Sequence, residues 1–443
     1  AAISSPRFQQ ELAGWRNSPA VDYHGQAAAR RRILEELSRC CFAGSSARIR
    51  ELQEFARANP AVEDYARFRA AGEKQRACWQ DWPEPARTGK LGQEDYDEGA
   101  RRYHLYVQWL AHEQMEALST RLRDRGLRMY LDFPLGVHPG GYDVWRNQDV
   151  FVPGASVGAP PDTVFTAGQD WSLPPLHPEK LRQQGYAHYI ACLRHHLQHA
   201  GILRIDHVMG LHRLFWIPKG LDCRDGVYVR YPADEFYAIL SLESWRNRAW
   251  IVGENLGTVP SHINPTLARH GIHGMYVLQY QFAADARRPI PTIPERSVAS
   301  LNTHDTPTFA GFWEGLDIKD RLQLGLLENV AAGAERLTRR AMRKALVAYL
   351  KHYGWLDSDP ADAGQLARAC LSVLSASAAR LVLVNLEDLW QEEQPQNVPG
   401  TDKERPNWQR KARFGLETFC QMPSVRDTLH EMDFLRRQRK RRP

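Results

Sequence analysis

Two patterns of apolar positions divide the chain. From Tyr103 to Leu122, apolar residues recur at three- and four-residue steps or their multiples, as on one face of an amphipathic helix. Gly126 follows where a glycine commonly ends a helix. The residues before this helix are also mostly helical in pattern, except for a loop-like segment at 76–98 that is rich in Trp, Pro, Gly and charge. We therefore predict a helical insertion subdomain over residues 1–125.

From residue 127 onward, short apolar runs alternate with helical stretches. This alternation predicts a parallel sheet with helical crossovers. Almost every run ends in a polar residue, often a carboxylate, and this favours an α/β barrel of the (β/α)8 TIM type, in which chemistry lies at the C-terminal strand ends. We predict that residues 126–443 form such a barrel with two of its eight strands missing. The six runs are 127–132, 202–206, 250–254, 275–281, 298–303 and 381–387.

A long segment at about 143–178 follows the first run. It is rich in Gly and Pro and has few helix signals. Loops of this length inside a compact domain are usually functional. We predict that the segment covers the substrate, and a surface insertion is the alternative.

Charge, cysteine content and hydropathy exclude several classes of protein. The 58 basic and 52 acidic residues are mostly interspersed, which disfavours a nucleic-acid partner. No apolar run is long enough to span a bilayer. The seven cysteines include no C-x-x-C pair, which disfavours a disulfide framework or zinc site and suits the cytoplasm. We interpret His195, His196 and His199 as surface histidines and expect no metal and no cofactor.

Three acidic residues fit the chemistry of glycosidic bonds. Cleavage with retained stereochemistry needs two carboxyl groups about 5 Å apart, one as nucleophile and one as acid and base. Asp206 ends one run, and Arg204, two residues earlier, lies on the same side of the strand and can hold it ionised. Glu254 ends the next run, and Asp305 follows His304, which can donate to a sugar hydroxyl. Taken singly, each acid is more often a cap or an ion-pair partner.

The combination resembles a known family. The sequence is similar to the 4-α-glucanotransferases, also called amylomaltases or disproportionating enzymes, of glycoside hydrolase family 77. Three motifs carry the resemblance: Arg-Ile-Asp-His at 204–207, Gly-Glu-Asn-Leu-Gly at 253–257 and Asn-Thr-His-Asp at 302–305. It extends over about residues 20–440 through Pro160-Pro161-Asp162, Gly168-Gln169, Trp171, the run 274–282, Asn397–Thr401 and Pro406-Asn407-Trp408.

The resemblance implies a role for each matching position. Asp206 would be the nucleophile, Glu254 the general acid and base, and Asp305 the residue that stabilises the transition state. Arg204 and His304 would lie beside them at the donor sugar. The substrates would be α-1,4-glucans and maltooligosaccharides, and the chemistry needs no metal or organic cofactor. Further glucan contacts would come from Asp162, Gln169, Trp171, Asn255, Tyr280 and Asn397.

The sequence also departs from the family pattern. Thr163-Val164 stands where many members have aromatic residues, and Asn255 where Asp is common. The two strands that normally begin the barrel are not found, and the chain opens without Met. We therefore expect a family member that lacks its N-terminal part. Open sheet edges in such a chain predict self-association.

Three functions stay open at this point. The first is a glucanotransferase that passes glucan segments from one sugar to another. The second is an α-amylase-like hydrolase, which uses the same acids with water. The third is an inactive chain that binds glucan or pairs with a separate front fragment. A serine hydrolase is disfavoured because the G-x-S-x-G motif is absent from the sequence.

Overall fold

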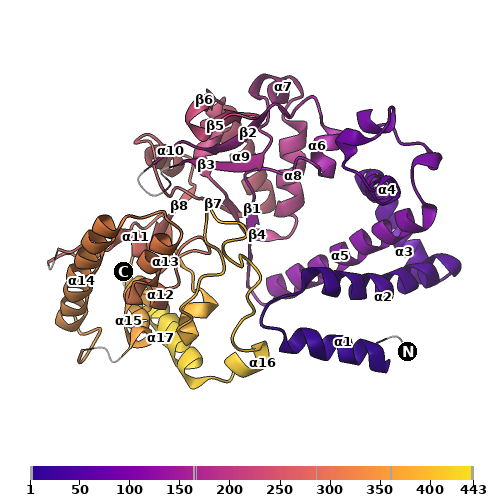
Figure 1. The fold of residues 1–443 in the computed structure, drawn as a ribbon. Coiled ribbons are helices and arrows are strands. Elements are labelled where there is room, and N and C mark those ends of the chain that lie inside the picture. Colours follow the sequence, from indigo (N-terminus) through magenta and orange to yellow (C-terminus); the bar gives the residue numbers. More distant parts are fainter. Residues whose placement is uncertain (1–2, 163–164, 166, 286, 360–361, 441–443) are drawn as a thin grey trace. The chain divides into compact units, whose positions relative to one another are not determined.

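The chain forms two compact units in this computed structural model, which describes residues 3–162, 165, 167–285, 287–359 and 362–440. The positions Thr163 and Val164, where the sequence departs from the family, lie outside the described residues. Figure 1 shows the course of the chain. The first unit comprises Ala1–Ser18, Asp22–Pro161 and Ala167–Ile251, and the second comprises Pro19–Val21, Asp162–Thr166 and Val252–Pro443.

The front of the first unit is helical, as its apolar periodicity predicts. The long helix α5 (Glu98–Asp124) packs against α2 (Tyr23–Ala43), α3 (Ala47–Ala58) and α4 (Pro60–Gln75), and α1 (Pro6–Asn17) precedes them. Leu52, Leu105 and Trp109 are buried among these helices. The Asp97 side chain caps α5 by accepting from the Ala100 N–H at 2.8 Å. The loop-like segment contains three short 3₁₀ turns, at Trp79–Asp81, Ala86–Thr88 and Gln93–Asp95.

Two parallel strands follow the helical part. Strand β1 (Met129–Phe133) pairs with β4 (Ala200–Ile205), and α8 (Ala187–Leu197) packs on both. Helix α9 (Ala233–Asn247) packs on α8. The surface position predicted for His195, His196 and His199 is wrong for His199, which follows the end of α8 and is only 9% exposed. It lies 3.4 Å from the Ser119 hydroxyl and 3.5 Å from the Glu116 carboxylate, both of α5.

The segment at 143–178 is not a plain loop. It begins within the short helix α6 (Tyr142–Arg146), contains two strands, and ends where α7 (Pro178–Gln183) begins. The strands join an antiparallel sheet in the order β3-β2-β5-β6. Backbone pairing with β5, more than 50 residues later, therefore orders a segment with little local structural signal. The four strands are β2 (Ala155–Ala159), β3 (Gln169–Leu173), β5 (Arg213–Pro218) and β6 (Val227–Arg230).

The second unit contains parallel strands in the order β7-β8-β9-β10. Strand β7 begins at the end of the first unit. The predicted runs locate these strands but extend too far at their C-terminal ends. Residues 278–281 form a helical turn, α11 (Leu278–Gln281), and residues 386–390 form the 3₁₀ helix η6 (Leu386–Trp390). The strands are β7 (Trp250–Gly253), β8 (His273–Val277), β9 (Ser297–Ser300) and β10 (Leu381–Val382).

Helices bury one side of the second unit's sheet. Leu346 of α14 and Leu366 and Leu374 of α15 are fully buried in its core. Among the residues described, no helix has both the length and the apolar composition that crossing a membrane requires. The helices are α10 (Ile263–Arg269), α12 (Phe309–Glu314), α13 (Leu316–Gln323), α14 (Asn329–His352), α15 (Ala363–Ala376), α16 (Leu416–Phe419) and α17 (Pro423–Lys440).

Candidate active site

Arg204 brings two carboxylates together in the first unit. Its Nη1 donates to both oxygens of Asp132, at 2.7 Å each, and its Nη2 lies 2.8 Å from Oδ1 of Asp206. The arginine side chain is 8% exposed, whereas Asp132 and Asp206 are 48% and 38% exposed. A buried guanidinium therefore holds two carboxylates that are each partly exposed to solvent. Alternation along β4 predicts the contact with Asp206, but the sequence analysis gave Asp132 no role.

A histidine and a tryptophan lie next to Asp206. His207 has a positive φ of 45°, which turns the chain sharply after β4. Its ring stands edge-on to Trp171 of β3, with centroids 5.3 Å apart. Burial lowers the pKa of His207 to about 4, so the imidazole is neutral at physiological pH. The Trp171 indole N–H donates to Oε1 of Gln169 at 3.4 Å, so these two predicted sugar contacts lie together.

Asp206 and His207 also line a large cavity of the first unit. Its volume is about 1220 Å³. Residues from the helical part and from α8 form other parts of its wall. The sequence analysis predicted a covering segment but no cavity between these elements.

Glu254 and Asn255 follow β7 in the second unit. Glu254 is 9% exposed, and its Oε1 accepts from the backbone N–H of Leu256 at 2.8 Å. Asn255 Oδ1 accepts from the Met275 N–H, and its amide donates to Asn264 Oδ1, both at 2.7 Å. Asn255 therefore ties the end of β7 to β8. A glucan contact by Asn255 stays a prediction.

Asp305 is held by side chains from two loops. Asn397 Nδ2 donates to Oδ1 of Asp305 at 2.7 Å, and His304 Nε2 lies 3.1 Å from the other oxygen, Oδ2. The His304 ring lies 5.7 Å from that of Trp408, which is 48% exposed. Three residues predicted from motifs far apart in the sequence, His304, Asp305 and Asn397, thus meet in one place.

Tyr280 lies close enough to Glu254 and Asp305 for their negative charges to affect its pKa. Desolvation, together with smaller contributions from the Asp305 and Glu254 carboxylates, raises the pKa of Tyr280 to about 12. The phenol is therefore neutral at physiological pH and can donate a hydrogen bond. It is 58% exposed, so one part of the side chain is open to a ligand. Sequence analysis placed Tyr280 in a strand, but it lies in α11.

Asp162 has a local partner in the second unit. Its Oδ1 accepts from the Phe165 N–H at 2.6 Å, and its own N–H donates to the Phe165 carbonyl at 3.0 Å. This turn approaches Gly400, where an added Cβ would lie 3.4 Å from the Phe165 ring. The Asp162 turn and the segment after Asn397 are therefore neighbours.

The chain is similar in sequence to a known family of proteins. A family model described as 4-alpha-glucanotransferase matches residues 1–417. The chain is 37% identical over 360 residues to a 4-alpha-glucanotransferase of Mycobacterium tuberculosis (strain ATCC 25618 / H37Rv), covering 79% of this chain and 50% of that protein. It is 38% identical over 320 residues to a Haemophilus influenzae protein of the same description, covering 70% and 46%. The chain thus spans about half the length of the curated relatives it matches.

Solved structures show the same fold. The amylomaltase from Corynebacterium glutamicum matches with a TM-score of 0.80 and 26% identity, covering 98% of this chain and 65% of that one. An amylomaltase from Streptococcus agalactiae, solved in complex with acarbose, matches with a TM-score of 0.77 and 21% identity, covering 97% and 84%. The predicted barrel class is confirmed, because the six parallel strands correspond to part of the TIM barrel of these proteins.

Proposed function

The chain belongs to glycoside hydrolase family 77, the 4-alpha-glucanotransferases, and on this premise we propose that it transfers α-1,4-glucan segments between maltooligosaccharides. One observation carries the assignment of roles. Arg204 is buried and ion-paired to Asp206, while the Asp206 carboxylate itself stays open on one side. A fixed cation at 2.8 Å favours the ionised carboxylate, which a nucleophile needs.

The first half of the reaction breaks a glycosidic bond. Asp206 attacks the anomeric carbon, and Glu254 gives its proton to the leaving glycosidic oxygen. A covalent glycosyl-enzyme forms at Asp206, and the shortened sugar leaves. The two carboxyl groups must approach to about 5 Å for this chemistry.

The second half remakes the bond on an acceptor. The 4-hydroxyl of another sugar attacks the glycosyl-enzyme, Glu254 takes the hydroxyl proton, and the bond to Asp206 breaks. Asp305, fixed by Asn397 and His304, is proposed to bind the donor sugar's hydroxyls as the ring distorts. The 48% exposed Trp408 offers a ring face on which a pyranose can stack.

The partners follow from this chemistry. The proposed ligands are α-1,4-glucans and maltooligosaccharides, with contacts from Gln169, Trp171 and Tyr280. We also propose a cytoplasmic location. All seven cysteines are free, and free cysteines are typical of reducing compartments.

Analysis of the products formed from pure maltotriose tests the function. Transfer converts two maltotrioses into glucose and maltopentaose, which mass spectrometry resolves. Asp206→Asn keeps the side-chain shape but removes the nucleophilic carboxylate. We expect it to lower turnover at least about a thousandfold, while Asp124→Asn at the exposed end of α5 leaves it unchanged.

Two outcomes would reject the proposal. Net formation of reducing ends without longer products would show an α-amylase-like hydrolase. Binding of maltooligosaccharide without any conversion would show an inactive chain. Full turnover by Asp206→Asn would reject the role of that residue while leaving the activity in place.

A further inference from the structure

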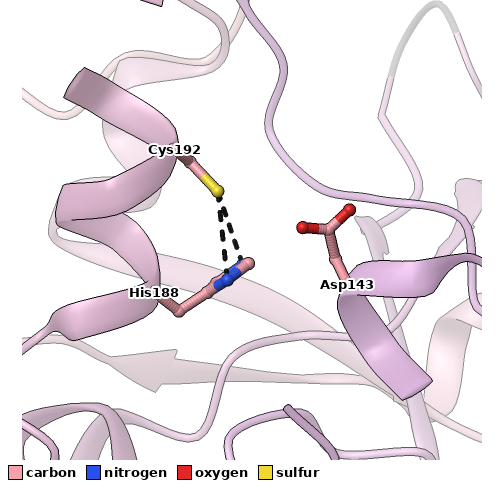
Figure 2. Close-up of side chains that lie close together, drawn as sticks. All are labelled: Asp143, His188 and Cys192. Carbon is pink, nitrogen blue, oxygen red and sulfur yellow. Dashed lines mark hydrogen bonds between the residues drawn. The ribbon is translucent and has the colours of Figure 1, made fainter. Parts of the chain in front are cut away.

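Asp143, His188 and Cys192 converge in the first unit (Figure 2). His188 and Cys192 are four residues apart on α8, so their side chains lie on the same face of the helix. Asp143 extends towards them from α6. The Cys192 Sγ lies 3.8 Å from Nε2 and 3.9 Å from Nδ1 of His188. One donor atom from each of the three residues lies within 4.8 Å of the other two.

We propose that Asp143, His188 and Cys192 bind one divalent transition-metal ion of the zinc class. An imidazole nitrogen, a thiolate sulfur and a carboxylate oxygen are the three donor types that Zn²⁺ uses in proteins. The harder cations Mg²⁺ and Ca²⁺ prefer oxygen alone. The donor set therefore selects a borderline-soft ion.

The separations fit the size of such a site. Zinc–sulfur and zinc–nitrogen bonds of about 2.3 and 2.1 Å at a tetrahedral angle place the two donor atoms about 3.6 Å apart. The sulfur–nitrogen distances of 3.8 and 3.9 Å are already close to this value. The carboxylate distances, within 4.8 Å, must each shorten by up to about 1.2 Å to reach the same value.

The remaining contacts of these residues favour a ligand. Within the part of the chain that the structure describes, no hydrogen bond or ion pair involves the Asp143 carboxylate. Asn147 Nδ2 lies 3.5 Å from His188 Nδ1, and Phe151 packs edge-on against the same ring at 5.4 Å. A metal-bound imidazole donates its second N–H to an acceptor, so binding through Nε2 requires the Asn147 amide to turn its oxygen, in place of its nitrogen, towards Nδ1.

A catalytic cysteine–histidine pair is the competing interpretation. Burial, with a smaller contribution from the Asp143 carboxylate, raises the pKa of the Cys192 thiol to about 12. Burial also lowers the pKa of His188. The free pair is thus neutral, which suits neither a thiolate nucleophile nor an imidazolium. A bound cation removes this obstacle, because it displaces one proton from the thiol to solvent as the metal–sulfur bond forms.

The site is open to solvent on one side. All three residues line the cavity of about 1220 Å³ in the first unit, which provides an entry path. Three protein ligands leave a fourth position for water. The ion would connect α6 to α8 and so fix the chain that follows β1. Five other histidines line the same cavity and could compete for a metal: His112, His195, His196, His199 and His207.

Metal binding to the untagged, chelator-treated chain tests the proposal without any substrate. We expect one Zn²⁺ per chain by equilibrium dialysis. Added Co²⁺ should show thiolate charge-transfer absorption. Cys192→Ser should remove that absorption, and Asp143→Asn and His188→Gln should each weaken binding at least about tenfold. The controls Cys420→Ser, at an exposed thiol, and His195→Gln, in the same cavity, should bind like the wild type.

Three results would overturn the site. They are no stoichiometric Zn²⁺, charge transfer that survives Cys192→Ser, and binding lost in His195→Gln but kept in His188→Gln. If Cys192→Ser fails to fold, as shown by its circular dichroism, the Asp143→Asn variant decides, since it keeps the side-chain volume. The metal measurement is independent of maltotriose turnover, so this proposal and the proposed function can fail separately.

Discussion

Asp388 is a buried carboxyl group that accepts hydrogen bonds from residues on both sides of Asp305 in the sequence. Its Oδ1 accepts from Asn302 Nδ2 at 3.1 Å and from the Phe309 N–H at 2.8 Å. Burial raises the pKa of Asp388 to about 6, although these two hydrogen bonds lower it in part. The folded chain therefore holds a proton that the unfolded chain has released. The Asp388 contribution to stability is present below pH 3.8 and is lost as the pH rises to about 6.

Asp388→Asn should remove this pH dependence. The amide stays neutral and keeps an oxygen that can accept both hydrogen bonds. Above pH 6 we expect the variant to be more stable by up to about 3 kcal/mol, since each pKa unit corresponds to about 1.4 kcal/mol. Urea unfolding from pH 4 to pH 7 measures this gain. The exposed Asp357→Asn serves as control, and parallel pH profiles for Asp388→Asn and the wild type would refute the role of Asp388.

At the scale of elements, the antiparallel sheet of the first unit depends on a glycine. A Cβ at Gly158 of β2 would lie 2.0 Å from the Gln169 carbonyl oxygen and 2.6 Å from Ile217 Cδ1. Strand β3 or β5 would therefore have to move. Because β3 carries Gln169 and Trp171, such a movement would also displace two proposed sugar contacts.

Gly158→Ala should destabilise the chain by about 1–3 kcal/mol, the usual range for overpacking. It should also weaken maltooligosaccharide binding. Gly154→Ala is the matched control, because an added Cβ there meets no heavy atom within 4 Å. Urea unfolding and titration calorimetry provide the two readouts. Equal stability of both variants would show that the sheet can shift without cost.

The elements that sequence analysis predicted are those with a strong local signal. The long helix α5 repeats its apolar positions over many turns, and all six parallel strands coincide with apolar runs. The predicted strand ends were less accurate. The run of buried positions in β8 continues through Leu278 and Gln279, although these residues form a helical turn. Strands β2 and β3 were missed because β2 is ordered by pairing with β5, which is distant in sequence, and β3 is ordered by pairing with β2.

In the candidate site too, residues marked by nearby sequence patterns were predicted, and residues brought in by distant parts of the chain were missed. The proposed roles of Asp206, Glu254 and Asp305 rest on motif order and stay predictions. The contact between Arg204 and Asp206, predicted from alternation, is confirmed. Asp132 needed the parallel pairing of β1 with β4, which places it beside Arg204. The proposed metal site was missed because Asp143 lies on another helix, far in sequence from His188, and no spacing rule connects them.

At the scale of the whole molecule, two strands end their sheets. Strand β1 of the first unit pairs with β4, and β10 of the second unit pairs with β9. Among the described residues, neither has a further strand on its other side. Unpaired strand edges present backbone donors and acceptors to other chains. The self-association expected from the sequence stays a prediction, and these two edges are where we expect it to occur.

Salt dependence distinguishes edge pairing from attraction between charges. The chain carries a net charge of +6, so copies repel one another at low ionic strength. Salt screens that repulsion, with a Debye length of about 10 Å at 0.1 M. Association through strand edges should therefore increase as salt is raised, whereas association through complementary charges should decrease. We expect sedimentation velocity to show oligomers that grow with protein concentration and with added salt. A monodisperse monomer across a hundredfold range of concentration would contradict this prediction.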